Sequence, residues 1–425
     1  MNTKETRATI SKIFNYIERG VEKTSFGDFY GHPGLYFFHT KEEFAIMLDK
    51  CLDKESYDRY DIYYIVEKLI KFLLDKYDSH TKLYFKNSIY FPISFKIQDN
   101  DFYIVNIIDE YKDVVGGKLV SINNIPVEKI VYELEQIINY STEEYKNIML
   151  TSDIKQLYIL RSLPSINNNT DKITYQINCD GKVIDVSFKG TERYDKLEST
   201  VKENYTYEKV DDILIIHYNS CKDIEKPITL CASEFLTFPQ KLVEKLKAIE
   251  KDINYYIVDI RNNSGGFSNI NHILIDFLTG KSIVTLINET VFSSGRMMLV
   301  DLKKIGSYVI GTNISTSLNA FGNVPGGLEV EKLDLIVKRS NTYWYYDENL
   351  RCQGFTKDNF YSYFKDKKEL LKPKVIEPDE YVYNTVDDII SNKDSQLERA
   401  IEYIKLKKQP LETNKLEGKC IKKII

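Results

Sequence analysis

The sequence predicts an α/β protein whose C-terminal half contains a mainly parallel sheet. From about residue 205 onward, short apolar runs alternate with amphipathic helical segments. The runs ILIIHY, YYIVDI and SIVTLI are continuously apolar rather than alternating, which is typical of parallel strands that helices cover on both faces. With 425 residues, the chain is long enough for two or three domains and a large buried core.

The N-terminal half has a different pattern of apolar residues. Apolar residues recur at helical spacing in 10–17 and 62–74, which predicts a mainly helical first unit. Short strand-like runs such as YFPISFKI and DFYIVNII follow it. We therefore divide the chain into an N-terminal helical domain, a strand-rich module, an α/β core and a tail, at 1–88, 89–200, 201–410 and 411–425.

Part of the second unit resembles a PDZ-like α+β module. GGKLVSINNIPV reads as a turn, a buried strand, an Asn-Asn turn and a short strand, and the helical run VEKIVYELEQII follows. PDZ domains bind an extended peptide by adding it to a sheet edge, so the resemblance implies peptide binding. A PDZ-shaped insert with a blocked groove fits the pattern equally well, and the helical stretch 141–163 puts the usual groove in question.

Composition excludes several classes of protein. The 58 Lys and Arg against 63 Asp and Glu give a net charge of −5, and no stretch is strongly basic, so we expect no nucleic-acid partner. The N-terminus has no apolar signal-peptide core, and no run approaches the roughly 18 apolar residues that span a bilayer. A cytoplasmic protein without membrane insertion follows as the expectation. The scattered cysteines predict free thiols rather than disulfides or a zinc site; they are Cys51, Cys179, Cys221, Cys231, Cys352 and Cys420.

Two strand-to-helix turns contain candidate catalytic residues. The first reads DIRNNSGG, where Gly265 and Gly266 allow close backbone approach and outward N–H groups, as an oxyanion hole requires. The second reads NETVFSSG, where Ser293 and Ser294 open a helix whose N-terminus favours developing negative charge. Each turn alone has a simpler explanation, because glycines serve tight turns and serine is a preferred helix N-cap.

The combination of these turns resembles the catalytic core of the C-terminal-processing, or tail-specific, serine peptidases. The resemblance covers most of the chain, from the Asp-x-His-Thr segment at 78–81 through Tyr218-Asn219 to YVIG and FGNV. It implies a crotonase-like (ClpP-like) core, no cofactor or metal, and a peptide or polypeptide substrate. It also implies Ser293 as the nucleophile, and an oxyanion hole from the N–H of Ser294 with that of Gly265 or Gly266.

One departure concerns the general base. The family's usual lysine position holds Ser317, whose hydroxyl cannot replace an amine as base. The chain therefore resembles a clostridial-type member without that lysine, and the Ser/His arrangement of tricorn protease offers another base. On that resemblance His80 is the base, Ser79 its adjacent serine and Glu348 the orienting carboxylate, since a histidine pKa near 6.5 suits proton transfer at neutral pH.

Several alternatives stay open from sequence alone. His217 or His272 could border the same cleft and act as the base in place of His80. The chain could be a catalytically silent relative that binds peptides, a reading favoured by Ser317 and by Arg296, which lies where many relatives have an acidic residue. A serine hydrolase acting on a small ester is a third reading. The sequence does not decide the oligomeric state, and a homo-oligomer is compatible with it.

Overall fold

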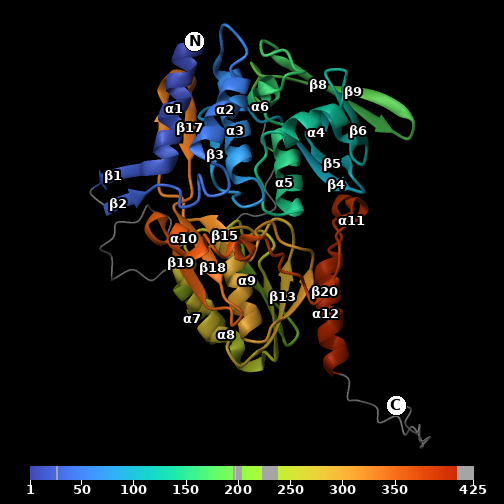
Figure 1. Cartoon of the computed structure of the whole chain (residues 1–425). Coiled ribbons are helices and arrows are strands. Elements are labelled where there is room, and N and C mark those ends of the chain that lie inside the picture. Colours follow the sequence, from blue (N-terminus) through green and yellow to red (C-terminus); the bar gives the residue numbers. More distant parts are fainter. Residues whose placement is uncertain (25–26, 195–196, 198–202, 223–237, 409–425) are drawn as a thin grey trace, which may run out of the picture.

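The structure is a computed structural model that describes residues 1–24, 27–194, 197, 203–222 and 238–408. Its elements form two stacked halves (Figure 1), with the N-terminal helices and the strand-rich module in one half and the C-terminal sheet in the other. The predicted tail at 411–425 lies outside the described residues.

The first 88 residues are mainly helical, as predicted. Three capping boxes begin the helices: the side chains of Asn2, Thr40 and Asp58 each accept a backbone N–H of the first turn. A β-hairpin separates the first two helices. The elements are α1 (Thr3–Arg19), β1 (Gly20–Thr24), β2 (Gly27–Tyr30), α2 (Lys41–Cys51), α3 (Arg59–Leu74) and β3 (Lys82–Phe85).

The next unit is an antiparallel sheet in the order β4-β5-β6-β8-β9, with β7 paired to β6. The predicted helical stretch 141–163 is present as two helices, α5 and α6, inserted between β7 and β8 after α4. The elements are β4 (Ile93–Gln98), β5 (Asp101–Ile107), β6 (Lys118–Ile122), β7 (Ile125–Pro126), α4 (Val127–Glu135), α5 (Glu143–Asp153), α6 (Leu157–Ser162), β8 (Lys172–Cys179) and β9 (Lys182–Lys189).

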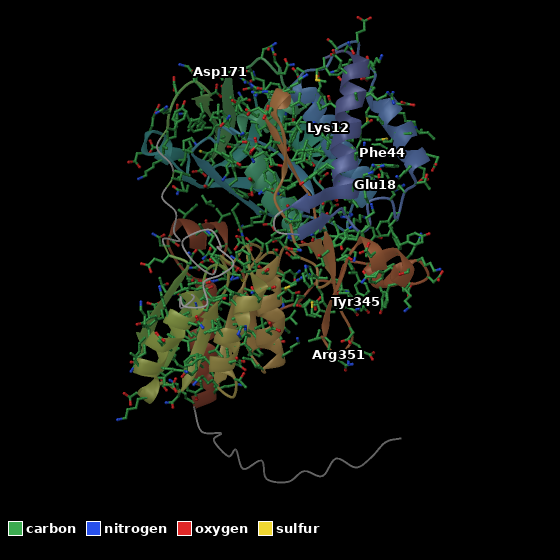
Figure 2. All side chains as sticks on the ribbon, turned by 90° about the vertical axis from the view of Figure 1, so that its left-hand side faces the viewer. Lys12, Glu18, Phe44, Asp171, Tyr345 and Arg351 are labelled. Atoms are coloured by element: carbon green, nitrogen blue, oxygen red, sulfur yellow. The ribbon has the colours of Figure 1, made fainter. Side chains whose placement is uncertain are left out.

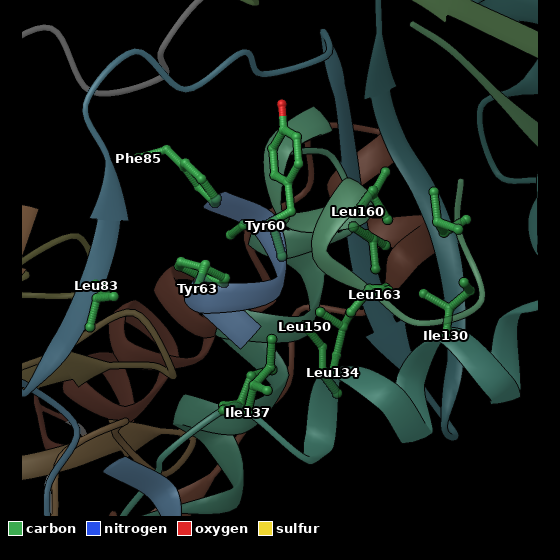
Figure 3. Packing of buried hydrophobic residues seen from close by; sticks show 14 of the residues in the cluster. Tyr60, Tyr63, Leu83, Phe85, Ile130, Leu134, Ile137, Leu150, Leu160 and Leu163 are labelled. Atoms are coloured by element: carbon green, nitrogen blue, oxygen red, sulfur yellow. The ribbon is translucent and has the colours of Figure 1, made fainter. Parts of the chain in front are cut away.

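These two units share one hydrophobic core. Figure 3 shows Tyr63 of α3, Leu134 of α4 and Leu160 of α6 pointing into the same cluster. Leu335 and Val337, which come from far along the chain, belong to it as well. The predicted boundary near residue 88 therefore does not separate two independent cores.

The C-terminal half is built on a six-stranded sheet in the order β10-β11-β12-β13-β14-β20. Only β10 is antiparallel to its neighbour, so the predicted parallel sheet is confirmed. The strands are β10 (Tyr205–Val210), β11 (Ile213–Tyr218), β12 (Tyr255–Asp259), β13 (Ser282–Ile287), β14 (Tyr308–Gly311) and β20 (Glu380–Tyr381).

Helices cover both faces of this sheet, which explains why its strands are continuously apolar. Leu214 and Ile216 of β11 face one hydrophobic cluster with α7 (Phe238–Ile249), α8 (Asn271–Leu278) and α9 (Ser294–Lys304). The alternate residues Ile213 and Ile215 face Ala400 and Ile404 of α12 (Ser395–Lys408). Figure 1 shows α12 apart from the other three helices, across the sheet.

Short strands join the two halves. β17 pairs with β3 in the register Leu335↔Phe85 to Lys338↔Lys82, so the C-terminal chain holds the segment that follows His80. The remaining elements are β15 (Ala320–Gly322), β16 (Leu328–Val330), β17 (Leu335–Lys338), β18 (Thr342–Tyr346), β19 (Cys352–Phe355), α10 (Lys357–Phe364) and α11 (Val386–Ile390). Among the described residues, no helix combines the length and the apolar character that crossing a bilayer requires.

Candidate active site

Ser293 occupies a strained turn between β13 and α9. Its backbone has φ 53° and ψ −120°, outside the regions that residues with a Cβ favour. Its side chain makes no capping hydrogen bond to the helix, so the simple capping explanation does not hold for this serine. Such strain persists only where surrounding contacts enforce it, and it gathers at functional sites. A strained strand-to-helix turn is also how α/β hydrolases expose a nucleophilic serine.

Contacts from the loop after β14 hold this turn in place. The N–H of Ser293 donates to Thr316 Oγ1 at 2.8 Å. The Ser315 hydroxyl donates to the carbonyl of Val291 at 3.0 Å. Both bonds join the segment after β13 to the segment after β14, so two neighbouring strand ends fix the conformation of Ser293.

The glycine turn after β12 packs directly against Ser293. Asn263, fully buried, organises it: its amide donates to Tyr218 O at 3.0 Å, and its Oδ1 accepts the N–H of Gly265 at 2.9 Å. A Cβ at Gly265 would lie 2.7 Å from Ser293 Cβ and 2.8 Å from Ser294 N. The ends of β11, β12 and β13 thus meet at the carboxyl edge of the sheet, where ligands of open α/β sheets bind.

The backbone N–H groups at this junction are not equivalent. The N–H of Gly265 is already bonded to Asn263, whereas no described residue accepts the N–H of Gly266 or of Ser294. The Ser294 hydroxyl donates to Gly266 O at 2.7 Å and ties these two residues together. Of the two predicted glycines, Gly266 has the available donor.

His80 lies next to the serine turn without bonding to Ser293. Its ring stacks on Phe292, with the centroids 4.5 Å apart, and both ring nitrogens are buried without a hydrogen-bond partner. Burial lowers its pKa to about 4, assisted by the charges of Arg296 and Lys82 and opposed by the charge of Asp78 and by the nearby carbonyl of Phe321, which does not reach hydrogen-bond geometry with either nitrogen. The structure therefore brings His80 beside the nucleophile candidate but leaves the ring in a disengaged orientation.

Ser79 makes hydrogen bonds to the inserted segment that contains α5 rather than to the His80 ring. Its hydroxyl lies 3.1 Å from Ser141 Oγ and accepts the N–H of Ser141 at 3.0 Å. Its carbonyl accepts the hydroxyl of Tyr145 at 2.7 Å, and the Tyr145 ring stacks on Phe292 with centroids 5.0 Å apart. The insert thus contacts the His80 segment, which the sequence did not indicate.

Glu348 is not brought to His80. It is exposed in the turn between β18 and β19, in the stretch between Tyr345 and Arg351 that Figure 2 labels. Thr342 pairs with Gly322, the residue beside His80, and β18 carries the chain about 14 Å further, at roughly 3.4 Å per residue, before the turn that contains Glu348.

The residue at the family's lysine position and the two alternative histidines all make contacts elsewhere. The Ser317 hydroxyl is bonded to both Lys374 N at 2.7 Å and Lys374 O at 3.2 Å, so it has a structural role. His217 bridges Asp259 at 3.2 Å and Glu208 at 3.4 Å, and these hydrogen bonds and charges raise its pKa despite burial. His272 is exposed, with Nδ1 2.6 Å from Asn269 O.

The described residues contain no group of three or more His, Cys, Asp or Glu side chains that could hold a metal ion. The arrangement offers a serine on a strained turn, two N–H groups beside it that no described residue accepts, and an imidazole nearby.

Comparisons with known proteins identify the fold. No protein-family model and no curated protein matches the sequence. Among solved structures, mature CPAF complexed with lactacystin is similar over 95% of this chain and 98% of its own, with a TM-score of 0.62 at 13% identity. The chain has the fold of mature CPAF. A second structure of mature CPAF gives a TM-score of 0.61 at 12% identity, over 95% of this chain and 96% of its own.

A third solved structure is more distant. The photosystem II D1 C-terminal processing protease is similar over 91% of this chain and 96% of its own, at 10% identity, but its TM-score is only 0.42. The predicted resemblance to tail-specific serine peptidases is confirmed at the level of the fold. At 12–13% sequence identity, the comparison with mature CPAF shows a shared fold and nothing more.

Proposed function

We propose that the protein is a serine endopeptidase that cleaves unstructured polypeptide through an acyl-enzyme on Ser293. The observation that carries this is the Ser293 turn, which has a strained backbone, a side chain that caps nothing, and two neighbouring N–H groups that no described residue accepts. Residues held in such a backbone conformation cluster at functional sites, and a helix N-terminus favours the negative charge that acyl transfer develops.

The proposed reaction proceeds in two steps. The Ser293 hydroxyl oxygen bonds to the scissile carbonyl carbon while His80 accepts the hydroxyl proton. The tetrahedral intermediate then breaks the C–N bond, and the proton on His80 leaves with the amine. Water, giving its proton to His80, next attacks the acyl ester; the carboxylic product departs and the proton returns to Ser293.

The N–H groups of Gly266 and Ser294 would hold the oxyanion in both steps. Each such donor is typically worth about 100- to 1000-fold in rate. The Asn263 side chain supports this role indirectly, because its bond to Gly265 N–H at 2.9 Å fixes the turn that presents Gly266.

His80 must change orientation to act as the base. Catalytic hydrogen bonds are often long or misaligned without substrate and tighten in the complex. The lowered pKa keeps the imidazole neutral, which is the form that accepts a proton. A substrate that displaces the ring from Phe292 would bring it to Ser293.

A peptide-binding protein without turnover is the second candidate. It is favoured by the stacking of His80 on Phe292 with neither ring nitrogen bonded. A hydrolase of small esters, the third candidate, would use the same serine and the same N–H groups.

A fluorophosphonate probe with intact-mass readout tests the proposal. Wild type should gain one phosphonyl group and cleave an unfolded protein substrate, and Ser293→Ala should do neither. Ser391→Ala, at an exposed serine near α11, serves as the matched control and should behave as wild type. Absence of labelling at every pH would favour the binding protein. Labelling and ester turnover without any cleavage of polypeptide would favour the esterase.

A further inference from the structure

We propose that Asp78, held by His32, is the carboxylate that positions His80 and stabilises its protonated form during the reaction. This inference rests on the proposed function and assigns to Asp78 the role that the family resemblance implies for Glu348. Asp78 would be a positioning residue, because it acts on the reacting atoms through His80.

Asp78 is buried, and both of its carboxylate oxygens accept hydrogen bonds. Its Oδ1 accepts the N–H of His80 at 2.7 Å and the hydroxyl of Ser340 at 3.1 Å, and its Oδ2 accepts from His32 Nε2 at 3.1 Å. The side chains of Asp78 and His32 are both 0% exposed. Burial alone would raise the pKa of Asp78, but the hydrogen bond from His32 outweighs it and holds that pKa below its ordinary value. Asp78 is therefore an anion at neutral pH.

The charge of Asp78 is not neutralised by its partner. Because the N–H of Gly34 donates to His32 Nδ1 at 3.1 Å, that nitrogen carries a lone pair, and the proton of the ring is on Nε2, facing Asp78. His32 is then a neutral donor. No lysine or arginine of the described residues forms an ion pair with Asp78. A buried anion with only neutral donors is well suited to stabilise a cation that appears beside it.

His80 is that neighbour. Its Nδ1 lies 3.9 Å from Asp78 Oδ1, too long for a hydrogen bond but close enough for strong electrostatic coupling. The charged groups that face His80 from other elements, Arg296 of α9 and Lys82 of β3, both disfavour its protonation. Asp78 alone among these three groups favours the imidazolium.

Rotation of the ring would complete the arrangement. Turning His80 away from Phe292 and toward Ser293 lets Nδ1–H donate to Asp78 while Nε2 faces the serine hydroxyl, the order in which nucleophile, base and carboxylate act in hydrolases. Ser340 links this cluster to the C-terminal half, since its N–H donates to Thr81 Oγ1 at 3.0 Å and its hydroxyl to Asp78. The same contact therefore fixes the base segment against the chain that leads to β18.

The test is the pH dependence of fluorophosphonate labelling in the full-length protein. Asp78→Asn should slow labelling of Ser293 by at least about 100-fold near neutral pH. It should also move the acidic midpoint of the labelling rate to lower pH, because the variant loses the one charge that raises the His80 pKa. Glu348→Gln, the matched carboxyl-to-amide control, should change neither the rate nor the midpoint.

Each outcome has a defined meaning. If wild type is labelled on Ser293 and Asp78→Asn keeps its rate and midpoint, the role of Asp78 is refuted while the proposed function stands. If wild type is not labelled, the proposed function itself fails. A lower rate in Asp78→Asn with an unchanged midpoint indicates a purely structural role and also overturns the inference.

A measurement on wild type covers the case in which Asp78→Asn does not fold. In a crystal structure of the phosphonyl adduct, His80 Nδ1 should lie within about 3.2 Å of Asp78 Oδ1. An adduct in which Nδ1 bonds to a different carboxylate would contradict the assignment.

Discussion

The serine turn and the His80 segment are both held firmly, but only the first is aligned for chemistry. Ser293 and the glycine turn are fixed by strand ends of one parallel sheet, through Asn263 and Thr316. His80 comes from the other half, and its backbone is fixed by Asp78 and the β3–β17 pairing while its ring rests on Phe292. The proposed oxyanion site is therefore preorganised within the C-terminal sheet, whereas the proposed base, His80, requires a side-chain movement between the two halves.

The largest effect should come from removing the base. His80→Phe should reduce the rate of Ser293 labelling by about 100- to 10,000-fold, the usual contribution of a general base. The same variant should raise the free energy of unfolding by about 1 kcal/mol or more, because two buried nitrogens without partners are removed. Labelling kinetics and chemical denaturation measure the two effects. Full labelling activity in His80→Phe would show that another group is the base.

A substitution in the glycine turn beside Ser293 should reduce activity somewhat less than the loss of His80. Gly265→Ala places a Cβ 2.7 Å from Ser293 Cβ at a φ of 100°, so the serine turn must shift. We expect kcat/KM to fall about 100- to 1000-fold, the loss that follows when an oxyanion donor is misplaced. Ala at Gly280, which has open space around it and a similar positive φ, is the control for backbone strain alone. Equal losses in both variants would remove the case for an oxyanion hole here.

The pH dependence of stability separates the two regions further. His80 has a folded pKa of about 4 against about 6.5 when unfolded, so the unfolded chain binds the extra proton. Its contribution to stability is complete above pH 6.5 and is lost as the pH falls toward 4. The wild type should therefore lose on the order of 3 kcal/mol more than His80→Phe over that range. Parallel pH curves for the two proteins would show that the His80 ring is accessible and titrates normally.

The smallest effect on activity should come from Ser317. Because its hydroxyl is bonded to the backbone of Lys374, Ser317→Ala should lower the free energy of unfolding by about 1–3 kcal/mol, yet leave the labelling rate within about threefold. Thermal unfolding and labelling kinetics check both parts. A loss of labelling comparable to that of His80→Phe would show that Ser317 takes part in the reaction.

Local sequence patterns predicted most of the fold. The parallel strands and their helices followed from continuous apolar runs, and the serine and glycine turns from short motifs at strand ends. The pairing of β17 with β3 joins residues about 250 positions apart in the chain, as Leu335↔Phe85 illustrates, and no local pattern encodes such a partner. The shared core of the first two units escaped prediction for the same reason.

Within the proposed site, local sequence patterns single out the serine and glycine turns but not the contacts around His80. The choice between Gly265 and Gly266 required the Asn263 hydrogen bond, and the His32–Asp78 contact spans 46 residues. The sequence offered one signal, the Asp-x-His spacing at Asp78, which places a carboxylate beside the base. Glu348 follows from the family resemblance alone, and the turn between β18 and β19 places it away from His80.

Trapping the acyl-enzyme tests the central claim most directly. A peptide substrate mixed with wild type and quenched in acid should give, by intact mass, a protein carrying the N-terminal fragment of the peptide as an ester, mapped by digestion to Ser293. The adduct should be absent from Ser293→Ala, which should release no product. Cleavage of the peptide without any covalent adduct, or with an adduct on another residue, would contradict the account.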